Sequence, residues 1–413
     1  MRAARSRWPI AVVEVAAAVA LALVLPRFER GHNWPWFVHY ESGTAQATLA
    51  AIAGGMITLT GFVLTAVTII VQTVQSQSPR LLRLLNRTDG TPVLFGTFLA
   101  TSTFALAVLG QVKQDAVPSV SVTISEVLVL VSTCLFLRLL VTFRTSLTTG
   151  GLVRTVGREL RRLVDVTYQE DYDPQGDAAH SRPAAAAPTW QLTHKGPPGV
   201  FQAFDEPAAV RLAADAGAEI RLVPAVGDFI ATGEPLATVT GPPPPAEALA
   251  KVVHVGPVRT FEQDPAYGVR VIADIAIRAL SPAVNDPTSA VQALDQLDDV
   301  LHRLVTRSLG DGRLYDASGV VRVRFPAPRW ETFVALAVDE ILLYGAGSLQ
   351  VARRLTALLT DLQAAAPPAR REVVTVRLAT LRRMVSRAMP DPALAAEATE
   401  PDRQGIGSPR RDG

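Results

Sequence analysis

The sequence has 413 residues, of which 48% are hydrophobic and 19% are charged, and its formal net charge is +2. This length exceeds one ordinary domain, and the cations are not gathered into one strong basic patch, so we expect no nucleic-acid partner. Cys134 is the only cysteine, which excludes an intramolecular disulfide and a zinc site built from cysteines.

The first third of the chain is almost free of charge and contains four long apolar segments. A bilayer core is crossed by about 20 apolar residues in helical form. We therefore expect a four-helix transmembrane domain over residues 1–146, with the lipid bilayer as its partner. The predicted spans are 9–25, 44–75, 92–112 and 120–143. A cleaved signal peptide is the alternative for the first segment, because a charged start and an apolar core also fit one.

The positive residues predict how the spans are oriented. Arginines precede the first segment and follow the second and fourth: Arg2, Arg5, Arg7, Arg80, Arg83, Arg87, Arg144, Arg154, Arg158, Arg161 and Arg162. Arginine and lysine are enriched on the cytoplasmic side of membrane proteins. We therefore predict a multi-pass protein of the plasma membrane with both termini in the cytoplasm. The opposite loop, 26–43, carries aromatic residues that suit the bilayer interface: Trp34, Trp36, Phe37 and Tyr40.

Small and polar residues follow one another along the second segment at alternating steps of three and four, which places them on one helix face. They are Gly54, Thr58, Gly61, Thr65, Thr68, Gln72 and Gln75. One interpretation is a packing seam, since small residues let helices approach closely in lipid. The third segment has a similar face that would mate with it: Gly96, Ala100, Thr103, Ala107 and Gly110. The other interpretation is a polar pathway through a homo-oligomer, lined by the threonine hydroxyls and glutamine amides.

Two ionisable residues lie at similar depth near the inner ends of their spans, Glu14 in the first and Arg138 in the fourth. Charges inside a membrane are costly and are usually paired or functional. We predict that Glu14 and Arg138 form an intramembrane ion pair. Independent extension of each side chain to the interface is the alternative.

The water-soluble region is expected to be α+β. Residues 147–189 read as a basic helix and a flexible linker rich in proline, alanine and aspartate. Residues 190–245 alternate short apolar runs with turn signals, which predicts a small β-rich module. Its segment VPAVGDFIATGEPLATV (223–239) resembles the hammerhead of biotinyl/lipoyl-like barrels. That resemblance implies a barrel-like module without a cofactor, because the position of the carrier lysine is taken by Gly241 and prolines, and Lys251 comes only later.

Residues 246–389 are predicted to form a mostly helical domain. Asp264-Pro265 and Asp286-Pro287 are both helix-start signals, with aspartate as the cap and proline at the first helical position. The surrounding stretch holds the densest polar set: His254, Arg259, Asp264, Arg270, Asp274, Arg278, Asn285 and Asp286. One interpretation is helix capping and internal salt bridging, with Asp274 and Arg278 four residues apart. The other is a ligand or ion site.

The stretch FEQDPAYGVRVIADIAIRALSPAVNDPTSA (261–290) resembles the signature of an uncharacterised bacterial membrane family, domain-of-unknown-function family 2254. The segments QSQSPRLLR (75–83) and GDFIATGEPLA fit the same family, so the resemblance covers nearly the whole chain. It implies a membrane protein with a cytoplasmic domain and supplies no catalytic residues.

The last third is expected to contain a β-hairpin at 313–325, about three helices over 329–388, and a disordered tail at 390–413. Asp298 and Asp299 are expected on a solvated helix face.

The sequence contains no HExxH, P-loop or GxGxxG motif, so we assign no catalytic residue, metal site or cofactor. Three hypotheses stay open. The first is a membrane-anchored cytoplasmic binding, sensing or scaffold module. The second is an oligomeric ion channel or transporter lined by the second span. The third is a membrane-bound enzyme that uses the SPAVNDP region (281–287).

Overall fold

A computed structural model describes residues 8–29, 40–77, 91–114, 116–146, 149–174, 189–261 and 263–407. The chain divides into two compact units, unit 1 (Met1–Gly151) and unit 2 (Leu152–Gly413). The arginines at 2–7 and 80–87, the aromatic residues at 34–37 and most of the predicted linker lie outside the described residues.

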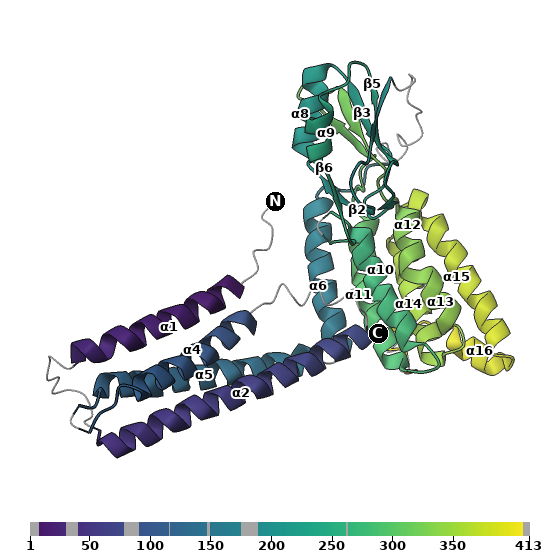
Figure 1. Ribbon diagram of the computed structural model, residues 1–413. Coiled ribbons are helices and arrows are strands. Elements are labelled where there is room, and N and C mark those ends of the chain that lie inside the picture. Colours follow the sequence, from purple (N-terminus) through teal and green to yellow (C-terminus); the bar gives the residue numbers. More distant parts are fainter. Residues whose placement is uncertain are drawn as a thin grey trace. The chain divides into compact units, whose positions relative to one another are not determined.

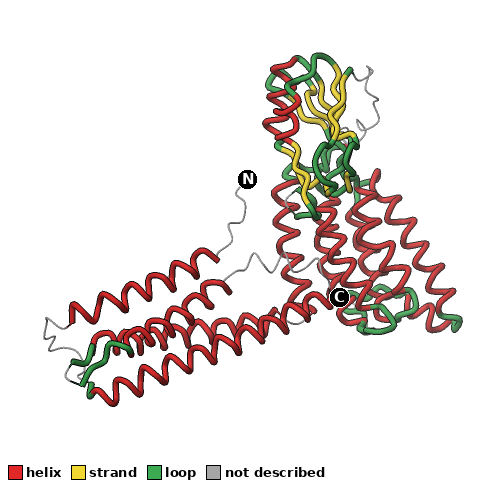
Figure 2. The backbone as a smooth tube through the Cα atoms, in the orientation of Figure 1, coloured by secondary structure: helices red, strands yellow, loops and turns green. Residues whose placement is uncertain are grey.

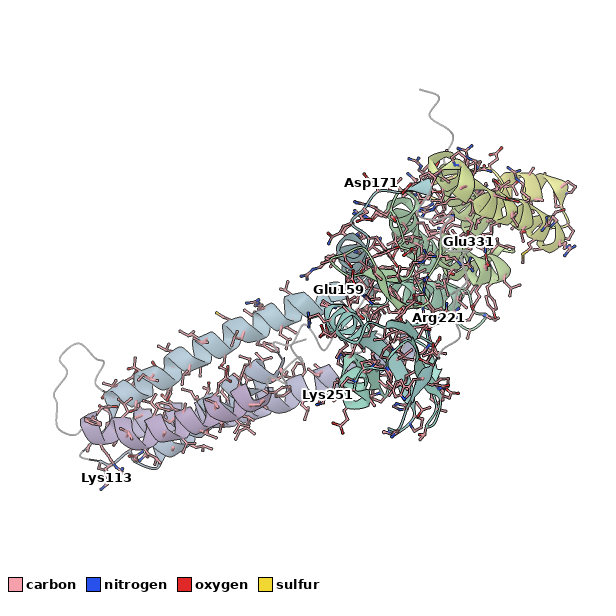
Figure 3. All side chains as sticks on the ribbon, turned by 90° about the horizontal axis from the view of Figure 1, so that it is seen from above. Lys113, Glu159, Asp171, Arg221, Lys251 and Glu331 are labelled. Atoms are coloured by element: carbon pink, nitrogen blue, oxygen red, sulfur yellow. The ribbon has the colours of Figure 1, made fainter. Side chains whose placement is uncertain are left out.

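Unit 1 contains four helices that are long and apolar enough to cross a membrane. They are α1 (Trp8–Glu29), α2 (Ser42–Gln77), α4 (Thr91–Leu109) and α5 (Ser119–Ser146). The four apolar helices expected from the sequence are thus confirmed. Figure 3 shows that their side chains consist mostly of carbon, with Lys113 at the turn between α4 and α5.

Helix α4 lies at the centre of this bundle and packs against α1, α2 and α5. The buried share of its apolar stretch is 61%, against 22% or less in each of the other three. Phe98 and Phe104 of α4 are fully buried. Gly96 lets α1 approach closely, because a methyl group there would lie 2.7 Å from the Cα atom of Ala11.

Buried hydroxyl groups connect the helices of unit 1. Ser102 of α4 donates to the carbonyl oxygen of Ala53 in α2 at 3.1 Å, and the hydroxyls of Thr101 and Ser132 lie 3.2 Å apart. Such bonds stabilise helix contacts where no water competes for the polar groups.

The carboxylate of Glu29, at the end of α1, accepts hydrogen bonds from the first turn of α5. Its oxygens lie 3.0 Å from the backbone nitrogens of Val120 and Ser121, and the Ser121 hydroxyl also donates to it. A negative charge at a helix N-terminus satisfies free N–H groups and opposes the positive end of the helix dipole.

We expect Glu29→Ala to lower the unfolding free energy of unit 1 by roughly 1–2 kcal/mol, the usual cost of a lost helix cap. Thermal unfolding of the detergent-purified protein measures the effect. Glu41→Ala is the control, because this exposed carboxylate precedes α2 and forms no side-chain bond in the described part of the chain. Equal melting temperatures for the two variants would contradict the capping role.

The β-rich part of unit 2 contains two sheets. One sheet has the order β1 (Trp190–Thr193), β5 (Pro235–Thr240), β3 (Glu219–Leu222), β8 (Val321–Arg324) and β7 (Arg313–Tyr315). The other has the order β4 (Phe229–Ile230), β2 (Gly199–Phe204) and β6 (Val253–Gly256). Helices α8 (Glu206–Ala216) and α9 (Ala246–Val252) complete this part. The two sheets are open, so the barrel-like closure implied by the hammerhead resemblance is wrong.

The hairpin predicted at 313–325 forms, and it joins the β-rich part. Strand β8 pairs in parallel with β3, with Ile220 opposite Val323 and Arg221 opposite Arg324. Ile220 and Val323 are fully buried in the same core. Local sequence patterns predict a hairpin but not its long-range neighbour, because pairing depends on burial contributed by both segments.

The helical layer of unit 2 is built from α6 (Thr149–Thr167), α10 (Pro265–Ala279), α11 (Pro287–Val305), α14 (Leu349–Ala365) and α15 (Pro368–Ala388). Helix α12 (Trp330–Val334), the π-helix η4 (Ala335–Asp339) and α13 (Glu340–Gly345) form one further, continuous element. Figure 2 shows the strands gathered at one end of unit 2 and these helices beyond them.

Helix α6, predicted as part of a connecting segment, belongs to this layer. Its buried side recurs at helical spacing: Leu152, Val153, Val156, Leu160 and Val164. A methyl group at Gly268 of α10 would lie 2.6 Å from Leu160, so this glycine permits the close approach of the two helices.

The predicted disorder of the tail is wrong for residues 390–407. Helix α16 (Pro392–Ala398) begins at Asp391, whose side chain accepts from the backbone nitrogen of Ala393 at 2.8 Å. Arg353 of α14 is 6% exposed and bonds the backbone oxygen of Glu397 at 3.1 Å as well as its carboxylate. This buried arginine anchors the tail through a long-range contact that composition does not predict.

Candidate functional site

The eight polar residues singled out from the sequence around α10 lie in several separate places. Asp264 precedes the first residue of α10, whereas Arg278 lies in its last turn. A helix of 15 residues is about 22 Å long, so its two ends cannot share one small site. His254 lies on β6, where it pairs with Ala203 of β2.

At the start of α10, Asp264 acts as a buried capping group. Its side chain is 3% exposed and accepts from the backbone nitrogen of Tyr267 at 2.9 Å. Arg259 donates to the same carboxylate at 3.0 Å, and its guanidinium lies 5.2 Å from the centre of the Tyr267 ring. Burial, and next the charge of Asp264, raise the pKa of Tyr168 above its ordinary value.

In the middle of α10, Arg270 binds two carboxylates. Its Nε atom lies 2.7 Å from Asp274, and its terminal nitrogens both bond Glu340 at the start of α13. Asp274 thus pairs with Arg270, and not with Arg278 as predicted. The hydrogen bonds from Arg270 lower the pKa of Glu340, an effect that burial opposes.

At the far end of α10, Asp286 caps α11. It accepts from the backbone nitrogen of Ser289 at 3.0 Å and from the Ser289 hydroxyl. Asn285 has a φ of 47°, the left-handed conformation that asparagine tolerates better than most residues. The side chains of Asn285 and Arg278 are both exposed.

A charged network joins α11 to α14, and it was not predicted. Arg354 of α14 is 4% exposed and binds Asp295 at 2.8 Å and Asp298 at 2.6 Å. His302 lies 2.9 Å from the other oxygen of Asp298. The expectation that Asp298 lies on a solvated face is therefore wrong. The spacing of Asp295, Asp298 and His302 could have indicated that these side chains share one face of α11. The sequence gives no sign that Arg354 is buried against them.

Asp298 raises the pKa of His302, chiefly through its side-chain hydrogen bond, whereas burial lowers it and Asp361 adds a smaller rise. The imidazole lies near Asp298 on its own helix and near Asp361 on α14. A raised pKa stabilises the fold fully below the ordinary value of 6.5, and this contribution is lost as pH rises through the folded value.

We expect His302→Gln to lower the melting temperature of the purified protein more at pH 6 than at pH 8.5. The wild-type imidazole carries its charge at the lower pH and loses it as the pH rises. A melting-temperature difference that is the same at both values would contradict this account.

The small and polar stripe of α2 faces away from the other helices of its own unit. Gly54, Thr58, Gly61, Thr65, Thr68 and Gln72 are all exposed, and the side chain of Gln75 lies outside the described residues. A methyl group at Gly54 or Gly61 would meet no atom within 4 Å. In the single chain the stripe therefore does not mate with the small residues of α4.

Glu14 and Arg138 are not brought together. The Glu14 carboxylate lies against α4, where a methyl group at Gly96 would touch its Oε2 atom. It also contacts the Thr97 hydroxyl, and no ion pair of Glu14 forms among the described residues. One oxygen of the Glu14 carboxylate is therefore buried against the backbone of α4 at Gly96.

An open hollow of about 430 Å³ lies on the β-rich part of unit 2. Its lining combines apolar side chains with two carboxylates: Val223, Pro224, Asp228, Phe229, Ile230, Glu234 and Pro235. Phe229 is 67% exposed, so its ring is available for contact at the surface of the hollow. Asp228 and Glu234 each accept one backbone N–H, from Ala225 and Ala231. Neither carboxylate forms an ion pair within the described ranges.

Among the residues that the structure describes, no three histidine, cysteine, aspartate or glutamate side chains form a group that could hold a metal ion. Lys251, the first lysine after the hammerhead segment, lies in α9 (Figure 3).

Comparisons with known proteins agree with the four apolar helices. A family described as "Predicted membrane protein (DUF2254)" matches residues 4–361. The uncharacterized protein Mb1321c of Mycobacterium bovis is 32% identical over 385 residues, which cover 87% of this chain and 73% of that protein. The uncharacterized protein Rv1290c of Mycobacterium tuberculosis matches with the same identity and coverage. No solved structure matches the chain.

Proposed function

The chain belongs to the DUF2254 family of predicted membrane proteins, and from this premise we propose that it is a membrane-anchored binding module. In this proposal the four apolar helices hold the protein in the plasma membrane, and unit 2 binds a partner in the cytoplasm. The arginine distribution along the sequence supports placing both termini on the cytoplasmic side.

The hollow around Phe229 carries this proposal. It offers an exposed aromatic ring, two aliphatic side chains and two prolines beside the carboxylates of Asp228 and Glu234. Apolar surface flanked by uncompensated negative charge suits a peptide segment with alternating apolar and basic residues. The proposed partner is therefore a protein that presents such a segment.

A synthetic peptide in which leucine alternates with lysine tests the hollow. Fluorescence anisotropy with the full-length protein in a nonionic detergent measures its affinity. Burial of one aromatic side chain contributes roughly 1.5–3 kcal/mol, so Phe229→Ser is expected to weaken binding at least about tenfold. Asp228→Asn should also weaken binding, because it removes one charge that attracts the lysines of the peptide. The affinity of this variant should then fall less steeply with salt concentration than that of the wild type.

The matched control is Tyr315→Ser, which removes an exposed aromatic residue from β7. Its affinity for the peptide should equal that of the wild type. If Phe229→Ser and Tyr315→Ser bind the peptide alike, or if a peptide with glutamate in place of lysine binds equally well, the hollow is not the binding site.

A second candidate function, an oligomeric channel or transporter, is favoured by the exposed stripe of α2. Thr58, Thr65 and Thr68 donate to the carbonyl oxygens four residues earlier, at 2.9, 3.1 and 2.9 Å. Their hydroxyl oxygens can still accept hydrogen bonds from water or from another helix. A homo-oligomer that joins these faces would line its axis with them.

Ion flux from liposomes that contain the purified protein separates the two functions. A channel predicts a symmetric oligomer whose flux changes in Thr65→Leu and not in Val71→Leu, since both residues are exposed on α2 but only Thr65 lies on the stripe. A monomeric protein without flux would remove the channel hypothesis.

A further inference from the structure

One end of the helical layer in unit 2 brings together segments that are distant in the sequence. Leu280, the residue that follows α10, lies beside Gly345. Gly347 lies beside Ala388, the last residue of α15. The loop 280–286, the turn 345–348 and the end of α15 therefore meet, and α16 packs on α14 close to them. We call this the proximal end of unit 2, and Figure 1 shows α16 there.

The first turns of α6 lie at the same end. Helix α6 runs parallel to α11, because Arg161 pairs with Asp299 and, one turn later, Asp165 pairs with Arg303. Extending this register backward places Thr149 of α6 beside Pro287 at the start of α11. Because α10 runs antiparallel to α11, its last turn also ends there.

Large apolar side chains are exposed at the proximal end, although they come from four separate segments. Their exposed fractions range from 45% to 65%: Val284, Leu343, Tyr344, Leu394 and Ile406. An apolar group of this kind, assembled by the fold on one end of a unit, marks a surface that contacts an apolar environment.

Arginines without a partner surround these apolar side chains. Arg154 lies near the start of α6, Arg278 in the last turn of α10 and Arg387 in the last turn of α15. All three are exposed, and they form no ion pair or hydrogen bond among the described residues. The nearby carboxylates of Asp286 and Asp391 are occupied by capping the starts of α11 and α16.

Chain connectivity keeps the start of α6 close to the bilayer. The apolar stretch of α5 ends at Val141, and α6 begins at Thr149. At about 3.5 Å per residue, these eight steps span at most roughly 28 Å even when fully extended. The proximal end is therefore the part of unit 2 that reaches the lipid headgroups most readily.

We propose that the proximal end of unit 2 docks on the membrane surface, with its apolar side chains at the interface and its arginines on anionic phospholipid headgroups. Apolar burial and attraction to anionic headgroups act together in interfacial binding. Each arginine near such a surface strengthens the attraction to anionic lipid. This surface is separate from the hollow around Phe229, so the inference stands independently of the proposed function.

Nitroxide labels on the full-length protein in lipid nanodiscs test this docking. Cys134→Ser removes the native thiol, and the single substitutions Val284→Cys, Ile406→Cys and Tyr315→Cys then supply one label site each. Collision with oxygen, relative to a water-soluble nickel complex, reports how deep each label lies. In nanodiscs with phosphatidylglycerol, we expect interfacial depth for the labels at positions 284 and 406 and aqueous exposure at position 315.

The arginines are tested by replacing Arg154, Arg278 and Arg387 together with glutamine. We expect the labels at positions 284 and 406 to become at least about threefold more accessible to nickel in this variant. The same increase is expected when the arginines are kept and phosphatidylcholine replaces phosphatidylglycerol in the nanodiscs. The matched control replaces Arg211, Arg221 and Arg329, which lie on α8, on β3 and before α12. The control variant should keep the wild-type depth.

Two results would overturn the proposal. The first is equal nickel accessibility at positions 284, 406 and 315 in anionic nanodiscs. The second is a label at position 284 that neither oxygen nor nickel reaches, equally in anionic nanodiscs, neutral nanodiscs and detergent. Such shielding would mean that protein, and not lipid, covers the proximal end.

Discussion

Replacing Arg370 by methionine is expected to lower the unfolding free energy of unit 2 by roughly 3 kcal/mol. Arg370 is 2% exposed, and its Nη1 atom donates to the carbonyl oxygens of Leu304, Val305 and Arg307 at 2.9, 3.1 and 2.8 Å. Each buried acceptor left without a donor costs about 1–3 kcal/mol. The guanidinium also lies 4.1 Å from the centre of the Tyr172 ring, a contact that methionine only partly replaces.

Thermal unfolding of the full-length protein in detergent measures this effect. For a domain of this size, 3 kcal/mol corresponds to a melting-temperature decrease of roughly 6–12 °C. Arg382→Met is the control, because Arg382 is exposed on the same helix, and surface substitutions usually change stability by about 0.5 kcal/mol or less. Similar melting temperatures for the two variants would show that Arg370 does not hold the end of α11.

Gly312→Ala is expected to lower the unfolding free energy by about 3 kcal/mol or more, because a steric clash adds to the cost of the left-handed backbone. Gly312 has a φ of 69°, and a methyl group there would lie 2.2 Å from the carbonyl oxygen of Phe325. That oxygen belongs to the backbone, so it cannot move aside as a flexible side chain could. The substitution therefore forces β7 and β8 apart, since the Phe325 nitrogen donates to the Gly312 oxygen at 2.8 Å.

Gly310→Ala separates the steric clash from the backbone strain. Gly310 has a φ of 74°, but a methyl group there would meet no atom within 4 Å. Only the left-handed backbone conformation is then penalised, at roughly 1–2 kcal/mol. Melting temperatures of the two alanine variants, compared with the wild type, give both quantities. Equal losses for Gly310→Ala and Gly312→Ala would contradict the close approach to Phe325.

Elements set by local chemistry were predictable from the sequence. The starts of α10 and α11 follow Asp264-Pro265 and Asp286-Pro287, because the capping side chain and the fixed φ of proline act within a few residues. The four apolar helices of unit 1 were predictable for a related reason. Their length and near absence of charge are properties of each segment alone.

Features that depend on distant partners were not predictable. Arg354 and Arg353 look like surface residues of an amphipathic helix, and only the fold shows that Asp298 and Glu397 meet them in a buried position. The candidate polar set around α10 failed to converge for the opposite reason. Its members are close in sequence, but a straight helix carries Asp264 and Arg278 to opposite ends.

The parallel pairing of β3 with β8 has a consequence for biosynthesis. Residues 223–320 lie between these strands in the chain, and they include α10 and α11. While this stretch is being translated, β3 lacks one of its two neighbours, and an unpaired strand edge invites association with other chains. Folding of the β-rich part on the ribosome must therefore wait for the hairpin at 313–325. Nascent chains arrested before residue 313 should be cleaved by protease in the β-rich part. Released full-length chains should resist cleavage there.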